Sequence, residues 1–211
     1  MMKRQALLLA AATACSATFM APALAAPAGS WTVGVGAGYV MPADDNGKLA
    51  NDTLSVDVDE DVRPTVTGEY FFADNVGVEV LAALPFHHDI SLKNAEGATI
   101  DAKTQHLPPT VSLQYHFDNV NTMVKPFVGI GANYTTFFKE RIYLNDADLK
   151  IKDSFGVAGH VGVDFPIAER DAVRVDARYI DIEPDVELNG NKIGTAEINP
   201  WVFGVSYIKS F

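Results

Sequence analysis

The sequence has few of the residues and motifs that thiol chemistry, phosphate binding or a membrane-spanning helix require. Its 211 residues include one cysteine, Cys15, so the chain cannot form an internal disulfide or a thiolate metal cluster. Acidic residues outnumber basic ones by 27 to 16, which argues against nucleic acid as a partner, because phosphate binding needs clustered Lys and Arg. Walker, dinucleotide-binding and Gly-x-Ser-x-Gly motifs are absent. Beyond residue 25, no apolar run approaches the ~18 residues of a spanning helix.

Residues 1–25 have the pattern of a bacterial secretory signal. Lys3 and Arg4 precede an apolar segment, and Ala23-Leu24-Ala25 has the small-x-small form of a cleavage site. We therefore expect cleavage after Ala25 and export of a mature domain at 26–211. Acylation at Cys15 is the less favoured alternative, because the residues before it lack the usual leucine of a lipoprotein signal.

Beyond the signal, the dominant pattern is alternation of apolar residues with polar or small ones, which is typical of β-strands. In the first such segment, Trp31, Val33 and Val35 alternate with threonine and glycine. Each segment is about ten residues long or slightly longer, and a tilted strand needs about 9–11 residues to cross a bilayer. The eight segments are 30–40, 62–72, 75–85, 104–117, 124–138, 153–165, 171–181 and 196–211.

The links between these segments alternate between long and short without exception. Outer-membrane barrels have an even number of strands, short periplasmic turns and longer extracellular loops. The pattern predicts an all-β fold, an eight-stranded antiparallel transmembrane β-barrel in the bacterial outer membrane, with both termini on the periplasmic side. The predicted extracellular loops are 41–61, 86–103, 139–152 and 182–195.

Aromatic residues lie near the ends of the apolar faces, as at Trp31 and Tyr39 in the first segment and Trp201 and Tyr207 in the last. Such rings match the interfacial girdles of membrane barrels, whereas a soluble sandwich does not usually turn Trp, Phe and Val outward in most strands. The expected surroundings are outer-membrane lipids and lipopolysaccharide. The aromatic final strand ending at Phe211 is typical of barrels that the outer-membrane assembly machinery inserts, which makes that machinery a predicted partner.

The opposite strand faces carry the predicted lumen, which mixes small residues with charges. Asp164, Arg174, Asp176 and Arg178 are expected to pair with opposite charges at a lumen floor, because an unpaired buried charge is costly. An interior filled by such pairs would be closed, since eight strands enclose room for side chains or one small ligand. The candidates for an apolar channel wall or its mouth are Leu81, Leu84, Phe86, Phe155 and Val202.

Three prolines interrupt neighbouring strand patterns. Pro85 lies near the end of one segment, and Pro108-Pro109 lie inside the next. Proline cannot donate a ladder hydrogen bond, so the pairing of these two strands is expected to fail locally. Two interpretations remain open: a lateral opening from the lumen to the membrane, and a simple bulge near the extracellular rim.

Catalytic and metal sites are not expected. Ser112, His116 and His160 are predicted to share the lumen, but no motif orients them as nucleophile and base. His87, His88, Asp89 and His106 include metal-ligand types, yet adjacent residues of a strand point to opposite faces, so we interpret these histidines as belonging to a surface loop. We expect no enzyme activity, no cofactor and no metal.

Five blocks of the sequence resemble, in order and spacing, blocks of the outer membrane protein W (OmpW) family. The similarity covers nearly all of 26–211, although the loops 41–61 and 182–195 are less recognisable and Phe155 stands where the family has Trp. The blocks are NVGVEVLAALPFHH at 75–88, HLPPT at 106–110, PFVGIGANYTTFF at 126–138, KDSFGVAGHVGVD at 152–164 and NPWVF at 199–203.

The resemblance implies an eight-stranded barrel with a narrow, largely apolar channel. It implies passage of small hydrophobic molecules across the Gram-negative outer membrane, with lateral release into lipid as the exit. The alternative is a structural, adhesive or receptor barrel with a sealed lumen, in which the long acidic loops carry the function.

Overall fold

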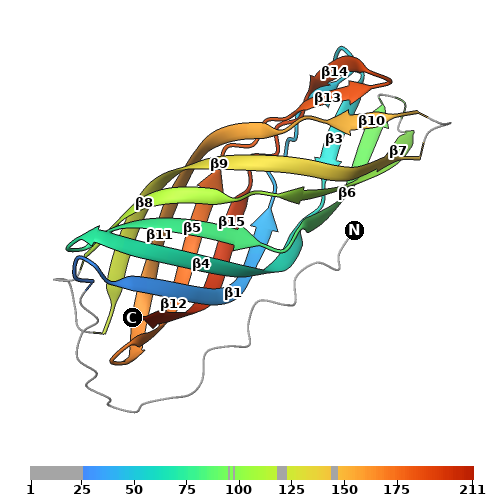
Figure 1. Cartoon of the computed structure of the whole chain (residues 1–211). Helices are drawn as coiled ribbons and strands as arrows, with labels where there is room; N and C mark the ends of the chain where they lie inside the picture. The colour runs from blue at the N-terminus through green and yellow to red at the C-terminus, as the bar shows by residue number, and fades with distance from the viewer. Residues whose placement is uncertain (1–25, 95, 97, 118–122, 144–146) are drawn as a thin grey trace, which may run out of the picture.

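The structure is a computed structural model that describes residues 26–94, 96, 98–117, 123–143 and 147–211. The predicted signal at 1–25 lies outside these residues. The described part is all-strand, and none of it forms a helix long and apolar enough to cross a membrane. Figure 1 shows one elongated body with the strands running along its length.

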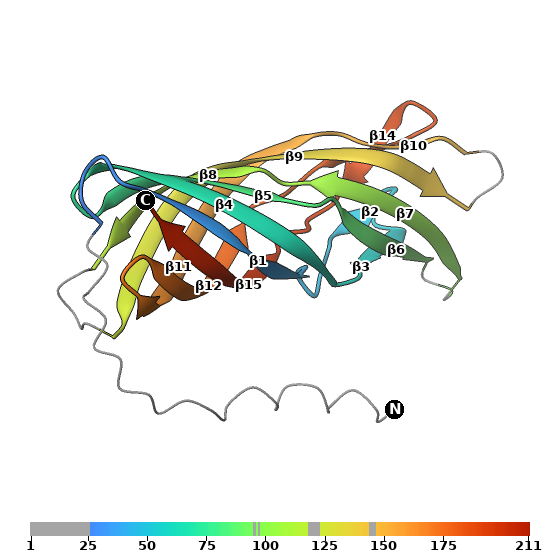
Figure 2. The ribbon, with the colours of Figure 1, turned by 60° about the horizontal axis from the view of Figure 1, so that its bottom comes forward.

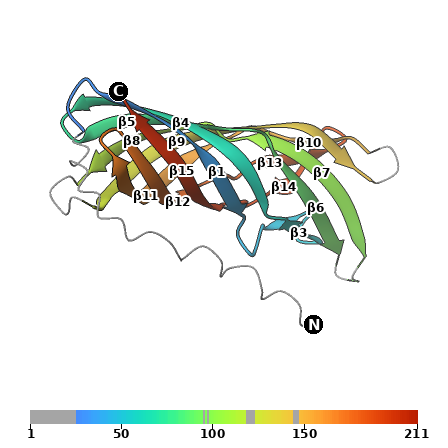
Figure 3. The same cartoon turned by 90° about the horizontal axis from the view of Figure 1, so that it is seen from below.

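Eight strands form a closed antiparallel barrel (Figures 1 and 3). Closure runs through the first and last strands, which pair from Thr32 with Ser210 to Met41 with Trp201. Every barrel strand therefore has a partner on each side, so none of them is a free edge strand. The barrel strands are β1 (Trp31–Met41), β4 (Asp61–Ala73), β5 (Val76–Ala83), β8 (Thr110–His116), β9 (Lys125–Ile142), β11 (Ser154–Ala168), β12 (Asp171–Ile180) and β15 (Trp201–Ser210). The predicted eight-stranded antiparallel barrel is therefore confirmed.

A second set of strands continues the barrel at the end that carries the long links, which we call the loop end. The opposite end, with the short turns and Phe211, is the turn end. Figure 2 shows the additional strands gathered at the loop end. They form an antiparallel sheet that joins the barrel through β9. They are β2 (Lys48–Leu49), β3 (Leu54–Val58), β6 (Phe86–Asn94), β7 (Thr99–Leu107), β10 (Leu149–Ile151), β13 (Asp185–Leu188) and β14 (Asn191–Thr195).

These additional strands lie largely in the links that the sequence predicts as loops, and their strand character is a finding of the structure. The predicted segment 104–117 is divided into the end of β7 and the whole of β8, with Pro108 and Pro109 between them. The predicted segment 124–138 continues to Ile142, where β9 pairs with β7.

The outward barrel surface is apolar and edged by two rows of aromatic rings. Val35, Val66, Ile130 and Val205 belong to its exposed middle. The two rows mark the levels at which amphipathic rings meet a membrane–water interface. Exposed rings near the turn end are Trp31, Tyr70, Phe72, Tyr115, Phe117, Phe165, Tyr207 and Phe211, and those on the barrel strands nearer the loop end are Tyr39, Tyr134, Phe155, Tyr179, Trp201 and Phe203.

Candidate functional site

The barrel interior near the turn end is filled by buried charges centred on Arg174. This guanidinium donates two hydrogen bonds to Asp164, from Nε at 2.7 Å and from Nη2 at 2.9 Å. Its Nη1 donates to Glu79 Oε2 at 2.9 Å. The planar fork of arginine suits such bidentate pairing, so two carboxylates from β5 and β11 are held by one side chain of β12.

Arg178, four residues further along β12 on the same face, extends the network. It donates to Glu79 Oε1 at 2.6 Å, to Ser112 Oγ at 3.3 Å and to His160 Nδ1 at 3.0 Å. His160 Nε2 lies 2.9 Å from Asp176 Oδ2. These contacts fit an imidazole that accepts at Nδ1 and donates from Nε2.

Aromatic contacts complete this layer. The Phe127 ring lies 4.2 Å from Arg174 Cζ and stacks on His116 at a centroid distance of 5.2 Å. His116 Nε2 in turn lies 2.9 Å from Glu69 Oε1. Side chains of six strands therefore meet across the interior. We call this group the plug; its members are Glu69, Glu79, Ser112, His116, Phe127, His160, Asp164, Arg174, Asp176 and Arg178.

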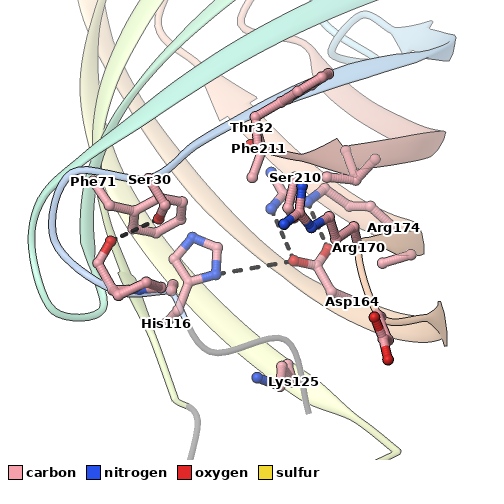
Figure 4. A pocket seen from close by; sticks show the side chains of 15 residues that line it. Ser30, Thr32, Phe71, His116, Lys125, Asp164, Arg170, Arg174, Ser210 and Phe211 are labelled. Carbon is pink, nitrogen blue, oxygen red and sulfur yellow. Dashed lines mark hydrogen bonds and ion pairs between the residues drawn. The ribbon is translucent and has the colours of Figure 1, made fainter. Parts of the chain in front are cut away.

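A cavity of about 250 Å³, lined by both charged and apolar side chains, lies between the plug and the turn end. Figure 4 shows Phe71 and Ser30 beside His116, and a contact from His116 to Asp164, which in turn binds Arg174. His116 Nδ1 is 3.9 Å from Asp164 Oδ2. The turn end of the interior is thus polar and charged, and an apolar solute entering it would displace water from groups that bind water well.

The interior at the loop end is apolar. The second sheet and the adjoining ends of the barrel strands enclose a cavity of about 30 Å³, comparable to the volume of one water molecule. We call this cavity with its wall the chamber. Thirteen of its fifteen lining residues are apolar: Leu49, Val56, Val58, Ile90, Leu92, Ala102, Phe137, Leu149, Ile151, Pro184, Val186, Ala196 and Ile198, with Thr104 and His106 as the polar ones.

The β13–β14 hairpin, which supplies part of the chamber wall, carries an ion pair on its polar side. Hydrogen bonds from Lys192 and Thr195 hold the pKa of the Asp185 carboxyl below its ordinary value. A lowered folded-state pKa stabilises the hairpin above the ordinary value of about 3.9 and stops doing so as pH falls through the folded value. We expect carboxyl ¹³C NMR to give an Asp185 midpoint below 3.9 and Lys192→Met to move it back up; an unshifted midpoint in the unmodified protein would contradict the pairing.

Three rings mark the boundary between the chamber and the barrel. Phe86 on β6 pairs with His106 on β7, and His106 pairs in turn with Phe137 on β9. Their centroids are 5.4 Å apart for Phe86 and His106 and 5.6 Å apart for His106 and Phe137. The rings are buried, so this row forms an aromatic floor beneath the chamber.

Directly beyond these rings, the ladder between two neighbouring strands is interrupted. β5 and β8 pair from Val76–Tyr115 to Leu81–Thr110, and pairing resumes at Phe86 with His106. Among the described residues, no backbone hydrogen bond joins 82–85 to 107–109. We call this interruption the ladder gap. It contains Pro85, Pro108 and Pro109, the three residues that the sequence analysis singled out.

The two sides of the ladder gap are each held by their other neighbour. On one side, Ala83 pairs with Thr65, and Leu84 N donates to Pro64 O at 3.1 Å. On the other side, Leu107 pairs with Thr136, and Tyr134 N donates to Pro109 O at 3.1 Å. The wall is therefore intact on both sides of the gap and interrupted only within it.

The structure separates the predicted channel residues into two groups. Phe86 and Val202 are buried in the apolar cluster of the loop end, and Leu81 lies on the inner face of β5 with Glu79. Leu84 and Phe155 are 59% and 75% exposed on the outer surface, so their prediction as channel lining is wrong. Strand alternation explains the difference, because Leu84 has the parity of Val80 and Phe155 that of Val157, both outward.

The four charges predicted for a lumen floor all lie inside the barrel, where Asp164 pairs with Arg174 and both Asp176 and Arg178 contact His160. Sequence analysis had not identified the chamber. The described residues contain no group of three or more His, Cys, Asp or Glu side chains placed to hold a metal ion. The interpretation of His87 and His106 as surface-loop histidines is wrong, because both lie on strands. His87 is on β6, where Arg63 Nη2 donates to its Nδ1 at 2.7 Å, and His106 is buried on β7.

Comparisons with known proteins agree with this architecture. The OmpW family matches residues 27–211. Outer membrane protein W of Vibrio cholerae is 36% identical over 196 residues, which cover 88% of this chain and 90% of that protein. The crystal structure of OprG from Pseudomonas aeruginosa superposes with a TM-score of 0.78 at 28% identity, covering 90% of this chain and 99% of that one. The solution structure of E. coli outer membrane protein W gives a TM-score of 0.63 at 34% identity, with 88% and 99% covered.

Proposed function

The chain belongs to the OmpW family of outer-membrane barrels, and from this premise we propose that it passes small hydrophobic molecules across the outer membrane and releases them sideways into the lipid. The ladder gap carries the proposal. It interrupts the wall immediately beyond the ring row, at the point where an apolar interior gives way to a charged one.

The polarity of the interior supports a sideways exit. A solute in the chamber contacts aliphatic and aromatic side chains, and its burial there is favourable at about 25 cal/mol per Å². Continuing along the axis, it would have to separate or bypass the paired charges around Arg174 and Arg178. Leaving through the ladder gap keeps an apolar solute in apolar surroundings throughout.

The sidedness of the molecule belongs to the same proposal. The loop end is the extracellular end, where the chamber takes up solute beside the lipopolysaccharide layer, and the turn end with Phe211 is periplasmic. The C-terminal strand β15 is the segment that the outer-membrane assembly machinery would recognise. The step needs no cofactor and no energy source, because the solute moves down its own concentration gradient.

A second candidate function is a sealed structural, adhesive or receptor barrel. The plug favours it, since ion pairs from several strands cross the interior. The ladder gap supports the conduit over the sealed barrel, because a sealed barrel has no use for an interrupted wall beside an apolar cavity.

Uptake of a labelled small hydrophobic compound by cells with and without the protein tests the proposal. Replacing Pro108 with Thr and Pro109 with Val restores two ladder donors and should reduce uptake to the level of cells lacking the protein. Pro126→Val, a proline replacement at the turn end of β9, is the matched control and should leave uptake unchanged. A heat-dependent gel shift confirms insertion of each variant beforehand.

Equal uptake with and without the protein, across several apolar solutes, would overturn the conduit and favour the sealed barrel. Protein-dependent uptake that survives the proline replacements in a properly inserted variant would place the exit elsewhere.

A further inference from the structure

Three fully buried polar side chains meet the Pro108–Pro109 break from inside the barrel. Thr110, Asn133 and Thr135 are each 0% exposed. They lie on β8 and β9, on the inner face that leads toward the apolar chamber. Buried polar groups at such a position cost free energy unless they are hydrogen-bonded, and apolar residues of similar size would avoid that cost.

Their hydrogen bonds converge on the carbonyl groups of the two prolines. Asn133 Nδ2 donates to Pro109 O at 3.1 Å and to Thr110 Oγ1 at 3.1 Å. Thr110 Oγ1 donates to Pro108 O at 3.2 Å. Both proline carbonyls therefore have a side-chain donor, and Pro109 O also accepts from Tyr134 N at 3.1 Å.

Asn133 is itself held in orientation. Thr135 Oγ1 donates to Asn133 Oδ1 at 2.6 Å, which fixes the amide with its nitrogen toward the prolines. The amide thus acts as a bridge between β9 and the proline segment, using both ends of its polar group.

The bridge explains why the Pro108–Pro109 segment stays with β9 and not with the 82–85 segment. A segment at an interrupted ladder can hydrogen-bond to the strand on either side of it. Here the backbone of 107–109 is hydrogen-bonded to β9, whereas the backbone of 82–85 is hydrogen-bonded to β4. We infer that Asn133 is a positioning residue that holds the Pro108–Pro109 segment against β9, so that the ladder gap is already present before a solute arrives. This goes beyond the proposed function, which requires an exit but not one that is already formed.

Distances across the gap test the inference directly. Leu84, which is 59% exposed, and the half-buried Leu107 lie on the two sides of the ladder gap, so spin labels on Leu84→Cys and Leu107→Cys, in a Cys15→Ser background, report on the distance across it. In lipid nanodiscs without added solute, Asn133 is expected to give one narrow distribution. Asn133→Leu, which keeps the approximate size and removes the donor, should depopulate that distance about fivefold or more, since each buried hydrogen bond shifts such an equilibrium by roughly that factor.

Asn46→Leu is the matched control. Asn46 is another buried asparagine, with side-chain bonds to Glu197 O and Val58 N far along the loop end. It should lower stability without altering the distance distribution. If Asn133→Leu does not insert, Thr135→Val, which removes only the bond that orients the amide, should broaden the distribution to a smaller extent.

An unchanged distribution in Asn133→Leu, or in Thr135→Val where only that variant inserts, would overturn the inference, as would an equal change in Asn46→Leu. The test is separate from that of the proposed function. If Asn133→Leu loses the narrow distribution but the unmodified protein supports no uptake, Asn133 is still the positioning residue and the conduit is overturned. If the unmodified protein supports uptake but Asn133→Leu leaves the distribution unchanged, the conduit stands and the role of Asn133 is overturned.

Discussion

Replacing Arg174 with methionine is expected to destabilise the barrel by about 3–5 kcal/mol, the usual effect of removing one partner from a buried ion pair. Arg174 is 3% exposed and binds both Asp164 and Glu79. Without it, Asp164 loses a bidentate partner and Glu79 loses one of its two arginine partners, keeping Arg178. Methionine fills much of the same space against Phe127, so the loss reports mainly the unpaired charges.

Urea unfolding in lipid, followed by the heat-dependent gel shift, measures this effect. Arg170→Met, an exposed arginine at the same end of the barrel, is the matched control and should change stability by no more than about 0.5 kcal/mol. Adding Asp164→Leu to Arg174→Met should recover part of the loss, because both members of the closest pair are then gone. A loss below 1 kcal/mol for Arg174→Met would mean that water reaches these carboxylates and that the plug does not close the interior.

The barrel itself could be predicted from the sequence because lipid outside and polar groups inside impose a period of two on every strand. The alternation in Trp31–Tyr39 gives the facing of β1, and Arg174, Asp176 and Arg178 of β12 fall on the inner face as the alternation predicts. Alternation cannot show which inward side chains pair with one another. Glu79 and Arg178 are 99 residues apart in the chain, and only the closed geometry brings them within 2.6 Å.

The chamber was missed because its strands lie in links that length alone assigned to loops. A short alternating pattern typical of a strand is present in these links, where Leu54, Val56 and Val58 alternate with Ser55 and Asp57. Such short runs are ambiguous without a partner strand, and β3 acquires its partners from β2 and β6.

The errors at Leu84 and Phe155 have a different origin. Both were chosen for their apolar character and place near the rim, although the alternation of their own strands already put them outward. The prolines show the opposite case, since Pro85 and Pro108-Pro109 mark the interrupted ladder in the sequence itself. Their support by Asn133 carries no sequence signal, because an asparagine on an inner strand face has many possible partners.

Replacing Ala102 with phenylalanine is expected to abolish protein-dependent uptake of hydrophobic molecules. Ala102 is 1% exposed and lines the chamber, which has about 30 Å³ of free space. A phenyl ring exceeds that space and pushes on Ile90, the ladder partner of Ala102 on β6, so the chamber can no longer widen to take up a solute. Overpacking of this kind lowers the free energy of unfolding by about 1–3 kcal/mol. The loop-end sheet is joined to a closed barrel, so we expect it to stay folded.

Ala132→Phe provides the matched control, because Ala132 is on β9 and faces outward, where lipid accommodates a ring. Uptake by that variant should equal that of the unmodified protein in the same cells. Comparing Ala102→Phe with the proline replacements then shows whether a solute passes through the chamber before it reaches the ladder gap. Loss of uptake in both Ala102→Phe and the Pro108→Thr, Pro109→Val variant means that chamber and ladder gap act in series, since blocking either one suffices. Loss in the proline variant alone would mean that solute reaches the gap without passing through the chamber, and the apolar cavity would then be only the core that holds the loop-end sheet together.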